Sequence, residues 1–334
     1  MSGARVLVIT IILVALRVAC GLPCTCFCFY DTQPLYGMNF DYPESEIRFS
    51  IETGAEGLVF FGSVFIDGHY GRTVGMNAQG LFASDQMVSP LRNPADEEAP
   101  GEIYVWRAFY EALTDCATVN EVRERLADQR LVSYPELALH DFFADPSSDA
   151  FVIEAGNTGN VATPIDGQFL VMTNFHNGDF RGDPPAAVRG DGADRYRIAC
   201  AALASALRRP ASFDVAAAFE LLHRASTSSG TYKTRYSLVL DPRALVVYIA
   251  LERDMDHLWR VSLRDQTIET YQGFSRYARL PLDATGVVGS LLTAYAEDDP
   301  PAAPTSQPVS AWPRVLFGTL LLAMFLFAIL GQRR

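Results

Sequence analysis

The sequence predicts an α+β fold built in layers, with largely antiparallel sheets. Short apolar runs that alternate as strands do come in blocks, and paired segments with helical spacing separate these blocks. The stretch between the two atypical ends of the chain is about 270 residues long, which suits one large domain. Apolar residues make up 49% of the chain, which is enough to bury a sizeable core.

The first 23 residues predict a secretory signal peptide followed by a short propeptide. An early arginine precedes an apolar run over residues 6–19, which is too short to span a bilayer comfortably. Small residues allow a cut after Gly21, which leaves Leu22 and Pro23 ahead of Cys24.

Residues 314–331 predict a transmembrane helix. The run is almost wholly apolar, with Trp312 at one edge and a pair of arginines at the other. A buried core helix is the alternative. Residues 296–313 are rich in Pro, Ala and Asp and predict an extended tether. The sequence therefore predicts an exported domain over residues 24–295, outside the cytoplasm and anchored to the membrane by this C-terminal helix.

The elements of the domain follow in a definite order. Strands are expected first, over residues 24–30, 35–41, 47–51, 58–65, 73–77 and 81–84. The last two are joined by a hairpin turn at 78–80. Helices are expected over 103–113 and from a capping box at 118–121 to 126. Further strands at 141–144, 150–154 and 169–173 precede two helices at 193–207 and 213–225. Strands at 236–240, 245–251 and 258–263 close the domain.

Composition and motifs argue against several classes of function. The net charge is −12 and no basic cluster occurs, which disfavours nucleic-acid binding. The chain has no phosphate-binding glycine loop, no Gly-x-Ser-x-Gly elbow and no His-Glu-x-x-His motif, and none of its five histidines lies in a recognisable catalytic setting. Neither a metal nor a cofactor is expected. Cys116 and Cys200 could form a disulfide, but the sequence does not show that they meet.

Cys24 is a candidate nucleophile that needs neither a histidine nor a metal. Cys24, Cys26 and Cys28 alternate along one strand and so face the same side. A cysteine that begins a mature chain can use its own α-amine as the general base, because that amine has an unperturbed pKa of about 8. Later trimming of Leu22 and Pro23 would expose Cys24. Cleavage of the Pro23–Cys24 bond by Cys24 itself is the route that we expect.

Several motifs occur in one order along the chain. Cys-Thr-Cys-Phe-Cys-Phe at 24–29 precedes Leu-Tyr-Gly-Met-Asn-Phe-Asp-Tyr at 35–42. Gly-Met-Asn-Ala-Gln-Gly-Leu at 75–81, Met-Thr-Asn at 172–174 and Asp-Arg-Tyr-Arg at 194–197 follow. This order resembles the choloylglycine hydrolase and penicillin V acylase superfamily of N-terminal-nucleophile hydrolases, and is most similar to its linear amide C–N hydrolases. The resemblance implies a four-layer αββα sandwich, here with a C-terminal transmembrane helix.

The resemblance implies a role for each of four residues. Cys24 would attack the amide carbonyl, and Asp41 would orient the new α-amine. Asn174 would donate a side-chain N–H to the oxyanion, and Arg195 would hold the thiolate and the nearby carboxylates. Each residue also has an ordinary structural interpretation: a buried strand cysteine, a turn residue, a strand-end cap and a surface arginine on a helix.

Four further residues are candidates for the oxyanion hole or the substrate pocket: Asn39, Asn77, Gln86 and Met87. Two positions depart from the family pattern. Met38 stands where the family has a basic residue, and Met87 falls near the place of an asparagine that completes the oxyanion hole in bile-salt hydrolases. Gln86 or a backbone N–H could substitute there. Neither departure suggests a bile-salt substrate.

The function expected from these residues is hydrolysis of a non-peptide linear amide through an acyl-enzyme. The substrate would be a small molecule such as an N-acyl amino acid or an acyl amine. Two alternatives stay open at this point. One is an acyltransferase of the same family, and the other is an inactive surface domain that binds an amide. A homo-oligomer is also left open.

Overall fold

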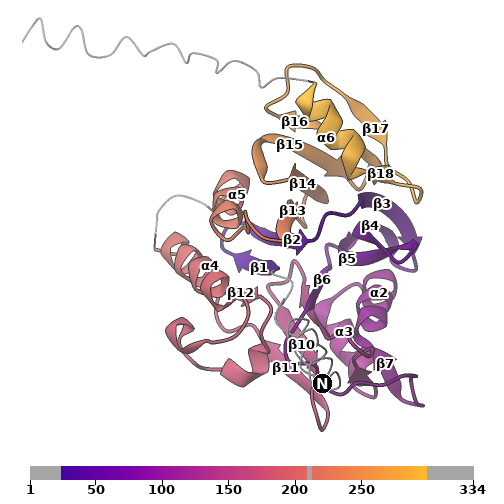
Figure 1. Cartoon of the computed structure of the whole chain (residues 1–334), viewed down its shortest axis with the longest axis vertical. Helices are drawn as coiled ribbons and strands as arrows, with labels where there is room; N and C mark the ends of the chain where they lie inside the picture. The colour runs from indigo at the N-terminus through magenta and orange to yellow at the C-terminus, as the bar shows by residue number, and fades with distance from the viewer. Residues whose placement is uncertain (1–23, 209–212, 299–334) are drawn as a thin grey trace, which may run out of the picture. The chain divides into compact units, whose positions relative to one another are not determined.

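The structure, a computed structural model, describes residues 24–208 and 213–298 (Figure 1). Two eight-stranded sheets, antiparallel throughout, dominate this part of the chain. In spatial order, the first sheet consists of β12 (Phe169–Met172), β1 (Thr25–Tyr30), β2 (Pro34–Tyr42), β13 (Lys233–Asp241), β14 (Val246–Leu251), β15 (Asp254–Ser262), β16 (Thr267–Gln272) and β17 (Arg279–Pro281).

The second sheet is formed mainly by the strands that follow β2 in the chain. In spatial order it consists of β11 (Asn160–Pro164), β10 (Ala150–Ala155), β9 (Leu139–Ala144), β6 (Phe82–Met87), β5 (His69–Asn77), β4 (Gly57–Ile66), β3 (Ile47–Gly54) and β18 (Val287–Val288). A short parallel pair lies apart from both sheets, β7 (Glu102–Tyr104) with β8 (Arg130–Val132).

Helices cover the outer faces of the two sheets. The helical elements are α2 (Val105–Asp115), α3 (Val119–Leu126), η1 (Asn177–Phe180), η2 (Pro185–Ala187), α4 (Ala193–Ala206), α5 (Val215–Arg224) and α6 (Gly289–Glu297). In Figure 1, α2 and α3 lie beside the second sheet, and α4 and α5 lie beside the first. The capping box before α3 forms in part as expected, because the Thr118 side chain accepts a hydrogen bond from Glu121 N.

Three apolar cores separate these layers. The largest lies between the two sheets and contains Cys26 and Phe60. A second core, with Cys116, joins the second sheet to α2 and α3, and a third, with Phe27 and Cys200, joins the first sheet to α4 and α5. The order of layers is helix, sheet, sheet, helix, which is consistent with the expected sandwich. Cys116 and Cys200 are both free and lie in different outer cores, so the disulfide left open above does not form.

Gly37 makes room for Phe27 in the hairpin of β1 and β2. It is paired with Phe27 across β1 and β2. A Cβ atom added at Gly37 would lie 2.2 Å from Cε1 of Phe27. Only glycine therefore lets the Phe27 ring lie flat over β2, and the ring then fills the core beneath α4 and α5.

The membrane anchor predicted from the sequence needs correction. Within residues 24–208 and 213–298, no helix is long and apolar enough to cross a bilayer. The predicted transmembrane helix at 314–331 lies outside the described residues, as do the predicted signal segment and most of the tether. The expected fold class is therefore corrected to a sheet-rich sandwich in the described residues, where no spanning helix occurs, and the membrane-anchored location is withdrawn. Helix α6 ends at Glu297, so its last two residues lie in the segment expected to be a tether.

The expected elements of the domain lie close to those observed, and several short ones were missed. Strands β11, β16, β17 and β18 and helix α6 have no counterpart among the expected elements.

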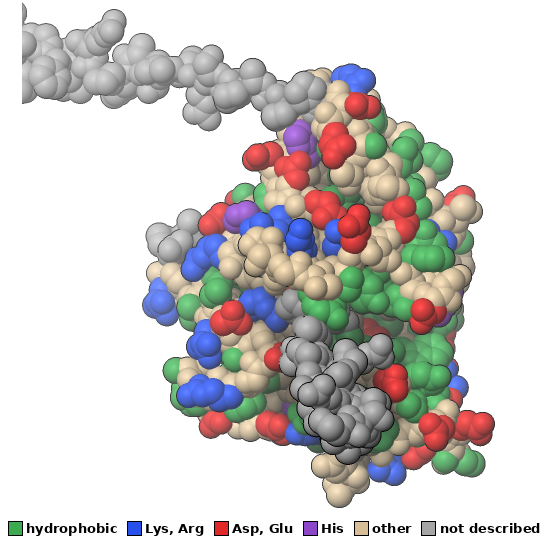
Figure 2. Space-filling model, in the orientation of Figure 1, with side chains coloured by type: hydrophobic (Ala, Val, Ile, Leu, Met, Phe, Trp, Pro, Cys, Tyr) green, Lys and Arg blue, Asp and Glu red, His purple; other side chains and the backbone are tan. Residues whose placement is uncertain are grey.

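Figure 2 shows acidic and basic side chains interspersed over one face of the molecule. The limits predicted for the domain, residues 24–295, stay a prediction.

Candidate active site

Cys24 lies at the start of the first sheet, immediately before β1. Its side chain is 3% exposed and packs in the core between the two sheets, as do those of Cys26 and Cys28. The three cysteines therefore face the same side, as their alternation predicts. The intervening residues Thr25, Phe27 and Phe29 lie on the opposite face of the sheet, which α4 and α5 cover. There Thr25 accepts a hydrogen bond from Arg195 of α4.

Both backbone polar groups of Cys24 are held by side chains from distant segments. The Cys24 N–H donates to Oδ1 of Asn174 at 2.8 Å, and Nη1 of Arg195 donates to the Cys24 carbonyl. Arg195 also donates to Oγ1 of Thr25 at 3.0 Å and, through Nη2, to Oδ1 of Asn174 at 2.8 Å. Arg195 lies in the first turn of α4 and is 7% exposed, so it is a buried residue of the site rather than a surface arginine.

The orientation of the Asn174 amide follows from its neighbours. Oδ1 accepts from two donors, Cys24 N and Arg195 Nη2, whereas Nδ2 donates to the Met87 carbonyl at 2.8 Å. The reversed amide would bring N–H groups against both donors. The Asn174 N–H that the sequence analysis assigned to the oxyanion is therefore engaged with Met87 in this state.

The Cys24 thiol is held in its neutral form. Burial, followed by the charge of Asp41, raises its pKa to about 12, and the smaller opposing effect of Arg195 does not offset this. Sγ lies 3.8 Å from the backbone carbonyl oxygen of Asp41. A thiol in this state reacts as a nucleophile only when a nearby base removes its proton.

The Asp41 carboxylate is buried and held by two threonines. Oδ2 accepts from Thr227 Oγ1 at 2.8 Å, and Oδ1 accepts from Thr234 Oγ1. Burial raises the pKa of Asp41 to about 6, although the hydrogen bond from Thr234 and the charge of Arg195 oppose this rise. The side chain influences the thiol through its charge, and its hydrogen bonds are to the threonines.

The side chains of Asn39 and Asn77 make their hydrogen bonds away from Cys24. The Asn39 amide donates to the Leu222 carbonyl at 2.7 Å and accepts from Ser237, which joins β2 to α5 and β13. The Asn77 amide closes the turn between β5 and β6 and donates to backbone carbonyls at the end of α2. Neither side chain contacts Cys24 or Asn174.

The two methionine positions differ in their place relative to Cys24. Met38 is fully buried between the sheets, where Ser84 Oγ lies 3.3 Å from its Sδ. Gln86 donates to the same Ser84 hydroxyl at 3.1 Å, so it faces this inter-sheet cluster. Met87 borders the site through its backbone carbonyl, which fixes Asn174.

The sequence analysis missed the residues that support the four predicted ones. Thr25 could have been noticed, because it follows the nucleophile in the motif. Thr227 and Thr234 are 186 and 193 residues from Asp41 in the chain, so no local pattern connects them to it.

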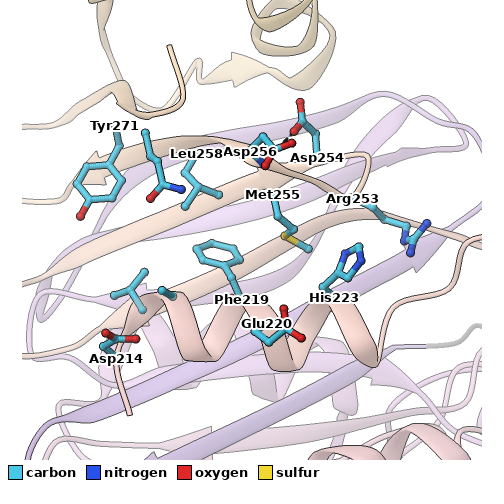
Figure 3. Close-up of a pocket in the computed structure, with 13 residues that line it drawn as sticks. Asp214, Phe219, Glu220, His223, Arg253, Asp254, Met255, Asp256, Leu258 and Tyr271 are labelled. Carbon is cyan, nitrogen blue, oxygen red and sulfur yellow. Dashed lines mark hydrogen bonds between the residues drawn. The ribbon is translucent and has the colours of Figure 1, made fainter. Parts of the chain in front are cut away.

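A cavity of about 730 Å³ lies between α5 and the β15–β16 region (Figure 3). Phe219 of α5 and Met255 of β15 lie on its facing walls, and the cavity lining does not include Cys24. At one end, Arg253 donates to Ser226 Oγ at 2.8 Å, next to the Thr227 that binds Asp41. In the part of the chain that the structure describes, no three His, Cys, Asp or Glu side chains are arranged to hold a metal ion.

The fold and this geometry define a class with known structures. The chain shares its fold with a conjugated bile acid hydrolase and a penicillin V acylase, which confirms the resemblance found in the sequence at the level of the fold. A mutant of conjugated bile acid hydrolase from Clostridium perfringens matches with a TM-score of 0.56 and 16% identity, over 75% of this chain and 96% of that one. A second variant of that enzyme matches equally well, with a TM-score of 0.56 and 16% identity over 74% and 96% of the two chains.

Penicillin V acylase from Agrobacterium tumefaciens matches with a TM-score of 0.50 and 14% identity, over 84% of this chain and 98% of that one. No protein-family model matches the sequence, and no curated protein matches it. At these identities the likeness shows the fold. The neighbours are by name a hydrolase and an acylase, and the chemistry of the present chain is argued below from its own residues.

Proposed function

We propose that this chain hydrolyses linear amide C–N bonds, with Cys24 as an N-terminal nucleophile. The observation that carries the proposal is the 2.8 Å hydrogen bond between the Cys24 nitrogen and Asn174 Oδ1, together with the Arg195 contacts that hold both residues. Cys24 lies outside the paired register of β1, so its N–H is accepted by this side chain rather than by a neighbouring strand. An amine released at this position would keep an acceptor and a fixed place beside its own thiol.

The reaction follows from the neutral thiol. The free α-amine takes the proton of the Cys24 thiol, and the thiolate adds to the carbonyl carbon of the amide. The tetrahedral adduct collapses when the α-ammonium returns that proton to the departing nitrogen, so the C–N bond breaks and a thioester remains. The amine then deprotonates a water molecule, which adds to the thioester. Collapse releases the carboxylic acid and restores the thiol.

Two neighbours assist this cycle in the proposal. The Asp41 carboxylate, held by Thr227 and Thr234, stabilises the α-ammonium that forms in each half of the reaction. Arg195 keeps the Cys24 carbonyl and Asn174 in place, so that the amine does not drift from the thiol. The proposed substrate is a non-peptide amide such as an N-acyl amino acid or an acyl amine.

The test combines the mature N-terminus with an amide-hydrolysis panel. The full chain is purified, its mass is measured, and release of amine is followed with penicillin V, a glycine-conjugated bile acid and N-acyl amino acids of several acyl lengths. Addition of an amine acceptor to each reaction measures transfer in competition with hydrolysis. We expect a chain that begins at Cys24 and hydrolyses at least one of these amides.

Cys24→Ala should abolish hydrolysis and leave the upstream segment attached. Cys28→Ala is the matched control, because Cys28 is buried on the same face of β1 and burial also raises its pKa to about 12. Active protein whose chain begins upstream of Cys24, or a Cys24→Ala variant with full activity, would overturn the proposal.

A further inference from the structure

Glu154 is a buried carboxylate that the reaction described above does not use. It lies near the end of β10 in the second sheet and is 1% exposed. Across the β9–β10 ladder its partner is His140, which is fully buried. Burying a carboxylate costs free energy unless hydrogen bonds replace its lost hydration. The groups that donate to Glu154 therefore indicate which part of the structure its charge stabilises.

The partners of Glu154 come largely from the loop that carries Asn174. Oε1 accepts from Asn177 N at 2.8 Å, and Oε2 accepts from Gly178 N at 2.9 Å. Nδ1 of His140 donates to Oε1 at 3.1 Å, and Nδ1 of His176 lies 3.4 Å from the same oxygen. Burial alone would raise the pKa of Glu154, but these neighbours, His140 foremost, outweigh burial and lower the pKa to about 2. Glu154 is therefore a carboxylate at neutral pH.

These contacts fix the backbone just beyond Asn174. The chain leaves the first sheet at the end of β12, passes Asn174 and enters η1 at Asn177. Glu154 belongs to the second sheet, so its two oxygens join the second sheet to a loop of the first. The same loop is also held at Asn174, where Ser89 N donates to the backbone carbonyl at 3.1 Å. The loop is thus held at both of its ends, by Ser89 at Asn174 and by Glu154 at Asn177 and Gly178.

Gly178 gives independent support, because a side chain at this position would collide with Val161 of β11. A Cβ atom added there would lie 2.3 Å from Cγ1 of Val161 and 3.2 Å from Oε2 of Glu154. The backbone of η1 therefore approaches β10 and β11 as closely as a residue without a side chain allows. This approach brings the Gly178 N–H within reach of Glu154.

We propose that Glu154 is a positioning residue: it fixes the loop from Asn174 to Gly178 and thereby holds the Asn174 amide against the nitrogen of Cys24. The inference rests on the proposed function, because the position of that nitrogen matters only if it becomes the base. The carboxylate is suited to this task because both of its oxygens accept. A glutamine would present an NH₂ group to one of the two backbone N–H donors.

Glu154→Gln tests the inference, with Glu269→Gln as the matched control. Glu269 is also a buried glutamate with a lowered pKa, but its partners lie away from Cys24: Tyr277 is in the segment between β16 and β17, and Arg260 is on β15. Wild type, both glutamine variants and Cys24→Ala are compared for kcat, KM and thermal unfolding. The rate of Cys24 alkylation by iodoacetamide is measured against pH in each chain that retains Cys24.

Glu154→Gln should lower kcat by about 10- to 100-fold, as small misplacements of catalytic groups do, with KM changed by less than about threefold. The pH dependence of alkylation should shift, because the amine no longer sits beside the thiol. Glu269→Gln should lose a comparable amount of thermal stability and keep its kcat and alkylation profile. If Glu154→Gln fails to fold, Gly178→Ala, which moves η1 and leaves the carboxylate in place, should show the same kcat loss.

A kcat and alkylation profile of Glu154→Gln equal to those of wild type would overturn the inference, as would an equal kcat loss in Glu269→Gln. Failure of the proposed function has a different signature. In that case wild type and Cys24→Ala do not differ in amide hydrolysis, whatever Glu154→Gln does.

Discussion

Asn174 allows a decisive experiment, because its two ends belong to different mechanisms. In the structure Oδ1 faces the Cys24 nitrogen and Nδ2 faces the Met87 carbonyl. The sequence analysis instead assigned the N–H to the oxyanion. Asn174→Asp keeps the shape and the Oδ1 acceptor but removes both N–H donors. Asn174→Ala removes both ends.

The contacts give the size of each effect. In Asn174→Asp the hydrogen bonds from Cys24 and Arg195, each 2.8 Å long, are kept, and both gain strength from the new charge. The Met87 carbonyl loses its donor and faces the second carboxylate oxygen instead, at a cost of at least about 1–3 kcal/mol in unfolding free energy. If Asn174 holds the amine, kcat should fall by less than about tenfold, or about 1.4 kcal/mol. If its N–H stabilises the oxyanion, the loss should be about 100- to 1000-fold.

The assay is steady-state hydrolysis of the best amide of the panel by wild type, Asn174→Asp and Asn174→Ala, with thermal unfolding of each. Asn77→Asp is the matched control, since Asn77 is equally buried, accepts two N–H groups and donates to backbone carbonyls away from Cys24. It should lose stability and keep kcat within about twofold. An Asn174→Asp kcat as low as that of Asn174→Ala would refute the assignment of Oδ1 to the amine.

Two further predictions concern Asp41 and Met38. The pKa of Asp41 is raised to about 6, so its contribution to stability is complete below its unfolded pKa of about 3.9 and is lost as the pH rises through about 6. In a Cys24→Ala background, urea unfolding should therefore show the chain with Asp41 losing about 2 kcal/mol relative to Asp41→Asn between about pH 4 and about pH 7.5. A constant difference would contradict this. Met38→Lys places an ammonium in the core between the sheets, so it should lower the free energy of urea unfolding by at least about 3 kcal/mol without raising kcat. The control Met38→Leu should cost less than about 1.5 kcal/mol. A stable and more active lysine variant would show that this position keeps the basic role it has in the family.

Much of the first sheet could be predicted because its signals are local. The alternation in β1 places Cys24, Cys26 and Cys28 on one face, and the structure has all three in the core between the sheets. The hairpin at 78–80 and the capping box at Thr118 are also local; the hairpin forms, and the capping box forms in part. The short strands β16, β17 and β18 were missed because pairing with neighbours, rather than their own sequence, makes them strands.

The sequence predicted which residues form the candidate site, but it did not predict the hydrogen bonds between them. The motif contains an asparagine at 174, but the orientation of its side-chain amide depends on which donors and acceptors lie next to it. Arg195 of α4 donates to Oδ1, and the Met87 carbonyl at the end of β6 accepts from Nδ2. These two contacts orient the amide so that Oδ1 also accepts from the Cys24 nitrogen. Glu154 shows the same limit more strongly, because its partners on the Asn174 loop are 23 and 24 residues away and carry no side-chain signal. Backbone N–H groups have no sequence signature, so a carboxylate that acts through them is visible only once the strands are in register.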